Sequence, residues 1–327
     1  MKKPTIRLNK RDYLILKLIY EYRFLSGDLL WYLIKDDTQS SQSGCAVGAD
    51  GKRRPISYGF KRQALSKRLK RLFDEGYVTR HYVTDEPQGR GYGTPRAIYG
   101  LGQNSPKVLF EFAGIPVSAT KKMIESNGVK SPFLRHALEV AAFKVTLMLA
   151  CEKIQGKVTL LFWEQGESIR ETVFLTDRAG EKIRLPVHAD AFFGLGVAGK
   201  KKKHFFLEID RGTEPIVSKS RRSNIRRKLI GYQIYRKSKQ FITRYSGAIN
   251  GFQVLLVTPG QIGNTGDSSG RVANISKEIL SQPRLYTSKS LFLLTTPDSF
   301  GLEVPLTIFS KIWISPNRGN SVFSLIE

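Results

Sequence analysis

Apolar side chains in the first hundred residues recur every three or four positions, which is the spacing of one face of an α-helix. Asn9 stands before the first such stretch and Asp12 occupies its third position, so the two residues predict a capped helix start. Two short extended patterns follow on either side of a glycine-rich turn. The sequence therefore predicts three helices and a two-stranded ribbon, over residues 10–22, 27–34, 57–75, 77–83 and 96–99.

The second half of the chain mixes helical and extended patterns. The stretch 133–154 is apolar on most sides and predicts a long buried helix. Short apolar runs and one basic helical pattern come after it, and together they predict an α/β sandwich around a mixed sheet. The predicted strands span 158–163, 171–175, 187–195, 204–210, 252–257 and 290–294, and the basic helix spans 220–239.

Composition divides the chain into two predicted domains. Residues 1–114 form the first, which ends with a short helix at 106–113, and residues 133–327 form the second. The stretch between them, 115–132, is rich in glycine, proline, serine and lysine and is predicted to be a linker. A polar segment over 35–55 is predicted to be a long loop inserted into the first domain. The predicted fold class is mixed α/β.

Charge narrows the choice of partner. Lys and Arg number 53 against 28 Asp and Glu, a formal net charge of +25 in 327 residues, which indicates a polyanion, most simply nucleic acid. A membrane is the alternative, but no apolar run approaches the roughly 18 residues of a spanning helix, and the N-terminus lacks the apolar run of a signal peptide. Cys45 and Cys151 are too far apart in sequence to indicate a disulfide framework or a zinc site. We therefore expect a cytoplasmic protein.

Three helices followed by a ribbon is the order of a winged helix-turn-helix domain. In such domains the third helix enters the major groove of double-stranded DNA and the ribbon touches the flanking backbone. Basic side chains gather on the predicted third helix, in the glycine-rich turn and at the start of the second basic helix. A solvated outer face is the alternative explanation for these charges. The candidate DNA contacts are Lys61, Arg62, Lys67, Arg68, Lys70, Arg71, Arg90, Arg221 and Arg222.

Three carboxylates belong to a hairpin predicted from Pro186 to Asp210. Strand alternation places His188 and Asp190 on one face of the first strand, and Glu208 and Asp210 on one face of the second. Acids within apolar strands are unfavourable to bury unless they are paired or bind a cation. The three carboxylates are therefore expected to converge on a partner. Salt bridges to neighbouring lysine and arginine side chains are the alternative.

The basic helix predicted after this hairpin carries one stripe of side chains. The stripe residues step by four, three, four and three positions, and they are Arg221, Ile225, Lys228, Tyr232 and Tyr235. If the stripe faces the sheet, Lys228 reaches the carboxylates. Alternatively, the Lys228 stem passes Tyr232 and leaves its ammonium group in water.

The order of these motifs along the chain resembles that of known protein families. It rests on Arg11-Asp12, 20–25, 68–73 and Pro95-Arg96 in the first half, and on His136, Asp190, 208–214, Lys228 and Tyr232 in the second. The second half is similar to the restriction-endonuclease-like fold of the PD-(D/E)xK nuclease superfamily. The whole chain, up to about residue 260, resembles the replication-relaxation family of plasmid and mobile-element proteins.

This resemblance implies a metal-dependent site. In the nuclease superfamily an aspartate and the acid of the (D/E)xK motif hold Mg²⁺, and the lysine helps to activate the attacking water. Asp190 and Glu208 match the two acids, with Ala189 in place of the proline. Asp210 stands where the lysine is expected. The resemblance therefore implies either that Asp210 is a further ligand of Mg²⁺ or Mn²⁺, or that Lys228 supplies the ammonium group.

Three functions remain open at this point. The first is a double-stranded DNA-binding protein of plasmid or mobile-element type, in which the nuclease-like domain binds or assembles without cutting. The second is a Mg²⁺-dependent DNA endonuclease that the winged helix brings to its target. The third is a winged-helix transcriptional regulator whose second domain dimerises or senses a ligand. A homodimer, and protein partners from the same element, are compatible with each.

Overall fold

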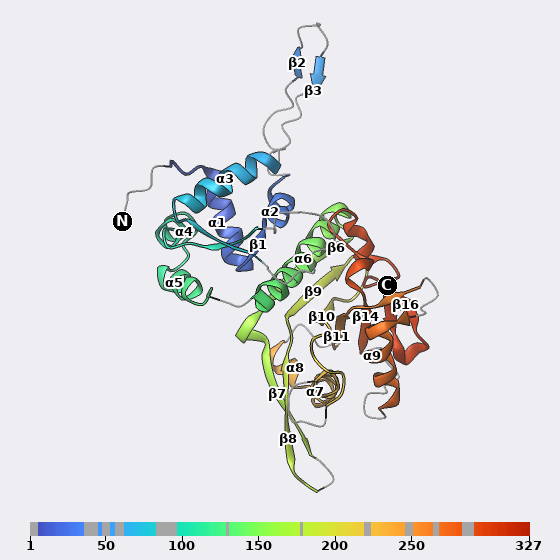
Figure 1. The fold of residues 1–327 in the computed structure, drawn as a ribbon. Helices are drawn as coiled ribbons and strands as arrows, with labels where there is room; N and C mark the ends of the chain where they lie inside the picture. Colours follow the sequence, from blue (N-terminus) through green and yellow to red (C-terminus); the bar gives the residue numbers. More distant parts are fainter. Residues whose placement is uncertain are drawn as a thin grey trace. The chain divides into compact units, whose positions relative to one another are not determined.

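The structure is a computed structural model that divides into two compact units, Met1–Val145 and Thr146–Glu327 (Figure 1). Helix α6 (Ser131–Lys153) continues across the point where the units divide. Each unit is described by itself below. The residues that the structure describes are 6–35, 45–47, 53–55, 62–82, 97–128, 131–176, 179–218, 224–245, 251–263, 268–282 and 291–327.

The first unit combines helices with a small antiparallel sheet, in the order β1-β5-β4. A capping box starts α1: the Asn9 side chain accepts a hydrogen bond from the Asp12 N–H at 3.1 Å, and the Asp12 carboxylate accepts one from the Asn9 N–H at 2.7 Å. The elements are α1 (Lys10–Tyr22), β1 (Leu25–Ser26), α2 (Gly27–Ile34), β2 (Cys45–Val47), β3 (Arg53–Pro55), α3 (Arg62–Asp74), β4 (Val78–Tyr82), β5 (Ala97–Leu101), α4 (Ser105–Ala113) and α5 (Val117–Glu125).

The predicted elements of this unit are largely confirmed. Helices α1 and α2 match their predicted ranges, α3 matches from Arg62 onwards, and β4 and β5 match the predicted ribbon. Residues 56–61 lie outside the described part of the chain. The segment predicted as a linker, 115–132, contains α5, which the sequence did not indicate. That helix buries Thr120 and Ile124.

A seven-stranded mixed sheet organises the second unit, in the order β16-β15-β14-β11-β10-β9-β6. Strands β9 and β10 form an antiparallel hairpin, and β10, β11 and β14 run parallel. The mixed α/β class predicted from the sequence is thus confirmed. The elements are β6 (Val158–Glu164), β7 (Arg170–Thr176), β8 (Lys182–His188), β9 (Ala191–Val197), β10 (Lys203–Ile209), α7 (Ile225–Ser238), α8 (Gln240–Arg244), β11 (Gln253–Val257), β12 (Gln261–Ile262), β13 (Ser268–Ser269), α9 (Gly270–Ser281), β14 (Phe292–Thr295), β15 (Trp313–Ser315) and β16 (Ser321–Phe323).

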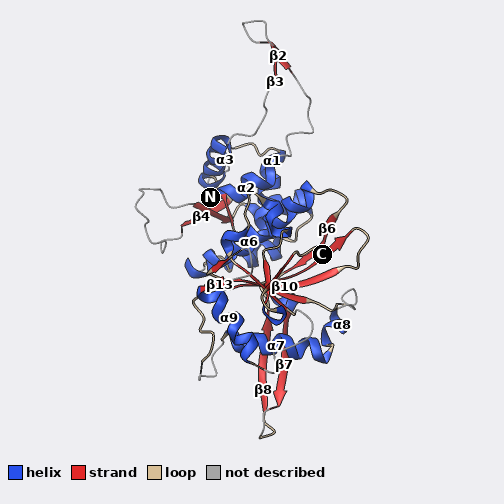
Figure 2. Cartoon of the chain, turned by 90° about the vertical axis from the view of Figure 1, so that its right-hand side faces the viewer, coloured by secondary structure: helices blue, strands red, loops and turns tan. Residues whose placement is uncertain are grey.

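The single strand predicted over 187–195 is wrong. The chain forms two strands there: β8 pairs with β7 in a separate two-stranded ribbon (Figure 2), whereas β9 joins the main sheet. Asp190 lies at the junction, where its N–H donates to the Leu207 carbonyl at 2.9 Å. Because His188 ends the ribbon strand, it does not share a strand face with Asp190. Val187, Ala189 and Ala191 alternate with His188 and Asp190 through the junction, so the alternation gave no sign of the break.

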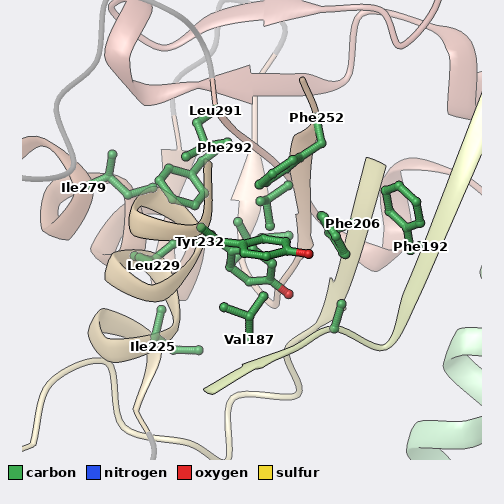
Figure 3. Packing of buried hydrophobic residues seen from close by; sticks show 14 of the residues in the cluster. Val187, Phe192, Phe206, Ile225, Leu229, Tyr232, Phe252, Ile279, Leu291 and Phe292 are labelled. Carbon is green, nitrogen blue, oxygen red and sulfur yellow. The ribbon is translucent and has the colours of Figure 1, made fainter. Parts of the chain in front are cut away.

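Helices α7 and α9 pack against one face of the main sheet. Tyr232 from α7 lies close to the aromatic rings of Phe206 and Phe252, and Ile279 from α9 lies beside Phe292 (Figure 3). The ring centroids of Tyr232 and Phe206 are 5.6 Å apart. Each such side chain, when fully buried, contributes roughly 1.5–3 kcal/mol to stability. This packing fixes the rotation of α7 over the sheet.

Helix α6, predicted as a long buried helix over 133–154, is confirmed over 23 residues. Val145 and Leu147 are fully buried within it. Charged positions such as Lys144 interrupt its apolar sequence. No helix in the described ranges is long and apolar enough to cross a membrane.

Candidate functional site

Helix α3 has one apolar face and one basic face. Its buried residues are Leu65, Leu69 and Leu72. Lys67, Lys70 and Arg71 are exposed on another side, where positions three and four apart are neighbours. Lys70 forms an ion pair with Asp74 of the next turn at 2.7 Å. The basic face of α3, defined as Lys67, Lys70 and Arg71, is therefore presented to solvent by a helix that the leucines anchor.

Arg68 does not belong to this basic face, although the sequence placed it there. Its side chain is only 18% exposed, and it pairs with Asp12 of α1, whose side chain is 0% exposed. Arg68 Nε donates to Asp12 Oδ1 at 2.6 Å, and Nη2 donates to Oδ2 and to the Arg7 carbonyl. The hydrogen bonds with Asp12 raise the pKa of Arg68. We therefore remove Arg68 from the predicted DNA contacts, because its guanidinium joins α3 to α1.

Arg62, at the start of α3, is exposed but engaged in local contacts. Its guanidinium carbon lies 4.5 Å from the centroid of the Trp31 ring, and Nη1 lies 3.5 Å from the carboxylate of Asp28. Of the other predicted DNA contacts, those that fall outside the described residues are Lys61, Arg90, Arg221 and Arg222.

Glu208 is a buried acid near the carboxyl end of β10. Its oxygens both accept hydrogen bonds from α7: Oε1 from the Tyr232 hydroxyl at 2.5 Å, and Oε2 from Lys228 Nζ at 3.3 Å. Burial raises the pKa of Glu208, Lys228 opposes that rise, and the nearby carboxylate of Asp190 adds to it. The Glu208 carboxylate is thus enclosed by protein donors.

Lys228 confirms the prediction that one stripe of the basic helix faces the sheet. Within the stripe, Ile225, Tyr232 and Tyr235 are buried. Lys228 Nζ lies between Glu208 and Glu214, 3.0 Å from Glu214 Oε2. Glu208 first, and Glu214 after it, raise the pKa of Lys228 and keep it protonated. The predicted approach of Lys228 to the carboxylates is therefore confirmed.

Asp190 completes this group from the junction of β8 and β9. Its Oδ2 accepts a hydrogen bond from the Ile209 N–H at 2.7 Å, which holds the carboxylate beside the end of β10. Asp190 is close enough to Glu208 to influence its pKa. We call Asp190, Glu208, Glu214 and Lys228 the acid–lysine cluster.

Asp210 does not join this cluster, so the predicted convergence of three acids is wrong. Arg271 of α9 pairs with Asp210 through two of its guanidinium nitrogens, Nε and Nη2. The Thr258 hydroxyl donates to Oδ2 of Asp210 at 2.6 Å, and the Gly212 N–H donates to Oδ1 at 3.0 Å. Burial alone would raise the pKa of Asp210, but the hydrogen bonds from Arg271 and Thr258 outweigh it and lower that pKa. Arg271 lies 61 residues further along the chain, so no sequence spacing pointed to it.

The acid–lysine cluster, as arranged, does not fit a divalent metal ion. The described residues contain no group of three or more His, Cys, Asp or Glu side chains that could hold one. Mg²⁺ and Mn²⁺ coordinate carboxylate oxygens that are free to approach them, whereas each oxygen of Glu208 already accepts one hydrogen bond, from Tyr232 or from Lys228. The Lys228 ammonium places one positive charge between Glu208 and Glu214.

The structure defines a mixed α/β protein with a basic helix face in one unit and a closed acid–lysine cluster in the other. Residues 16–251 match the family described as Replication-relaxation, and the chain belongs to that family. Membership associates the chain with replication or transfer of plasmids and mobile elements. No curated protein and no solved structure matches the chain.

Proposed function

We propose that the protein binds double-stranded DNA of a plasmid or mobile element through the basic face of α3. One observation carries the proposal. Lys67 and Arg71 lie one helical turn apart and exposed, and no ion pair to another described residue engages either of them. Exposed cationic side chains on a helix, without an ion pair to another described residue, are available to bind the phosphate backbone of DNA.

The local architecture supports this role. The order of α1, α2, α3 and the β4–β5 ribbon is that of a winged helix, in which the third helix enters the major groove. The Arg68–Asp12 pair connects α3 to α1, so the basic face keeps its orientation when DNA binds. Lys67 and Arg71 contact phosphates, and Lys70 joins them when DNA competes with Asp74.

Fluorescence anisotropy with a labelled duplex and the full chain tests this proposal. Lys67→Glu and Arg71→Glu should each weaken binding by about tenfold, because each reversal replaces an attraction to phosphate with a repulsion. Lys121→Glu is the matched control: Lys121 is exposed on α5, so the same change in net charge should leave affinity nearly unaltered. If all three variants lose the same amount of DNA affinity, the effect comes from net charge alone. That result would contradict the proposal that α3 is the DNA-binding surface.

The second unit then serves binding or assembly without cutting DNA. In the acid–lysine cluster, Lys228 forms ion pairs with both Glu208 and Glu214, and Asp210 is paired with Arg271. The cluster in its closed arrangement connects α7 to the end of β10.

A DNA endonuclease is the second candidate, because Lys228 lies beside Glu208 and Asp190, the residues that the resemblance to nucleases implies. Supercoiled plasmid incubated with the protein and Mg²⁺ or Mn²⁺ distinguishes the two. The first proposal expects no nicked product at any protein concentration. Nicking that disappears in Asp190→Ala and Glu208→Ala would establish the endonuclease instead, whereas nicking that persists in both variants comes from a contaminant.

A further inference from the structure

A basic cavity lies at the amino ends of the parallel strands in the second unit. Its volume is about 700 Å³, within the range of about 300–1,000 Å³ typical of small-molecule sites. The residues that matter for its chemistry come from the loop before β10, from α7, from the start of β11 and from the C-terminal segment. They are Lys200 to Lys203, His204, Arg236, Phe252, Arg318 and Phe323.

The basic cavity is separate from the acid–lysine cluster. Lys203 begins β10 and Glu208 lies near its other end. Five residues of extended strand span about 17 Å. The two sites therefore lie toward opposite ends of the same strand, and neither α3 nor the cluster contributes to the cavity.

Positive charge in the basic cavity is not balanced by the residues that line it. Six lining side chains are cationic, whereas Glu327, which acts on Lys203 and pairs with Lys311 at 3.3 Å, is the one lining residue with an acidic side chain. Burial and the neighbouring charge of Lys200 lower the pKa of Lys203. Like charges gathered in one concave place favour an anionic ligand.

The hydrogen-bonding groups of the cavity also favour an anionic ligand. Lys200 Nζ and Lys203 Nζ donate to the main-chain oxygens of Ile326 and Glu327 at 2.8 and 2.6 Å, so both ammonium groups are directed to neighbouring positions. His204 also lines the cavity and is only 4% exposed, yet its Nδ1 has no hydrogen-bond partner among the described residues. A buried polar atom of this kind is ordinarily satisfied, so His204 adds a further uncompensated polar group to the wall of the cavity.

Two aromatic rings, those of Phe252 and Phe323, also line the basic cavity. The guanidinium carbon of Arg318 lies 5.4 Å from the ring centroid of Phe323, and that of Arg236 lies 5.9 Å from the centroid of Phe252. Phe252 is buried, whereas Phe323 is partly exposed and offers its ring to a ligand. Lysines and arginines that bind phosphate, next to an aromatic ring that stacks on a base, form the recognition pattern of a nucleotide.

We propose that the basic cavity binds a nucleotide unit. The phosphates contact Lys202, Lys203 and Arg318, and the base lies against Phe323. The same chemistry is offered by a free nucleotide and by the phosphorylated end of a DNA strand. The test therefore has one arm for binding and one for the source of the nucleotide.

Isothermal titration of the full chain with ADP, adenosine and inorganic pyrophosphate tests binding. ADP should bind more tightly than adenosine, and Lys202→Glu and Arg318→Glu should each weaken ADP binding by about tenfold. Phe323→Ala should weaken ADP but not pyrophosphate, which has no base to stack. Lys277→Glu, an equal charge reversal on the exposed side of α9, should leave ADP binding unchanged. Absence of ADP binding, or equal weakening by Lys277→Glu, would overturn the proposal.

Competition against bound ADP identifies the source. The competitor is a six-nucleotide single strand with or without a 5′-phosphate, and the protein carries Lys67→Glu and Arg71→Glu so that α3 does not bind it. Displacement only by the phosphorylated strand assigns the cavity to a strand end. Failure of both strands, with ADP still bound, assigns it to a free nucleotide. Equal displacement by the two strands would contradict recognition of a terminal phosphate.

Discussion

Replacing Arg68 by alanine is expected to destabilise the first unit. The change leaves the carboxylate of Asp12, 0% exposed, without the guanidinium that neutralises it. Removing one partner of a buried ion pair costs about 3–5 kcal/mol. Because the Arg68 side chain is still 18% exposed, water can partly replace it, and we expect the lower end, about 3 kcal/mol.

Thermal unfolding of the full chain measures this effect. For a unit of this size a loss of about 3 kcal/mol lowers the unfolding temperature by roughly 6–12 °C. Arg71→Ala is the matched control on the same helix, and its exposed side chain should change stability by no more than about 0.5 kcal/mol. The double variant Asp12→Asn with Arg68→Met should recover part of the loss, because it removes both charges and keeps an amide oxygen for the Asn9 N–H.

One result would refute this reasoning about Arg68. If Arg68→Ala unfolds at the wild-type temperature but loses DNA affinity as fully as Arg71→Glu, its guanidinium contacts DNA and not Asp12. The basic face of α3 would then include Arg68, as the sequence alone suggested.

Two further predictions concern the second unit. Arg271→Met should destabilise the protein by about 3 kcal/mol at pH 7, because Asp210 would remain buried without its partner. The pKa of Asp210 in the folded protein is lowered from 3.8, so the ion pair stabilises the fold above pH 3.8, and its contribution is lost as the pH falls through the folded-state pKa. In urea unfolding, the difference in stability between Arg271→Met and wild type should therefore be smaller at acid pH than at neutral pH. A difference that stays constant with pH would contradict the ion pair. Tyr232→Phe should lower the free energy of unfolding in urea by about 1–3 kcal/mol, because Oε1 of Glu208 loses a buried donor. Tyr82→Phe, at an exposed position, is the control. Equal stability of the two variants would argue against the hydrogen bond.

The helices of the first unit were predictable because their signals are local. Asn9 and Asp12 form the capping box of α1 within four residues, and the Ser26 side chain caps α2 by accepting a hydrogen bond from the Leu29 N–H. The stripe that carries Lys228 was predictable as well, since helical periodicity alone decides which side chains share a face. The position of Lys228 against Glu208 followed from that periodicity.

The interactions that sequence patterns missed join residues that are distant along the chain. Asp12 and Arg68 are 56 positions apart, and Asp210 and Arg271 are 61 apart. Only the fold brings such pairs together, so each charged residue looked available when read from the sequence. The junction at Asp190 was missed for another reason: hydrogen bonds to the neighbouring strand β10, not a proline or glycine, turn the chain from β8 to β9.

The salt dependence of duplex binding tests the central claim most directly. Removing one cation that neutralises a phosphate should reduce the slope of log K against log salt concentration by about 0.9 in magnitude. The variant with Lys67→Gln and Arg71→Gln removes two exposed cations from α3 and should therefore show a slope shallower by about 1.8 than that of the wild type. A slope identical to that of the wild type would contradict the proposal that the basic face of α3 binds DNA.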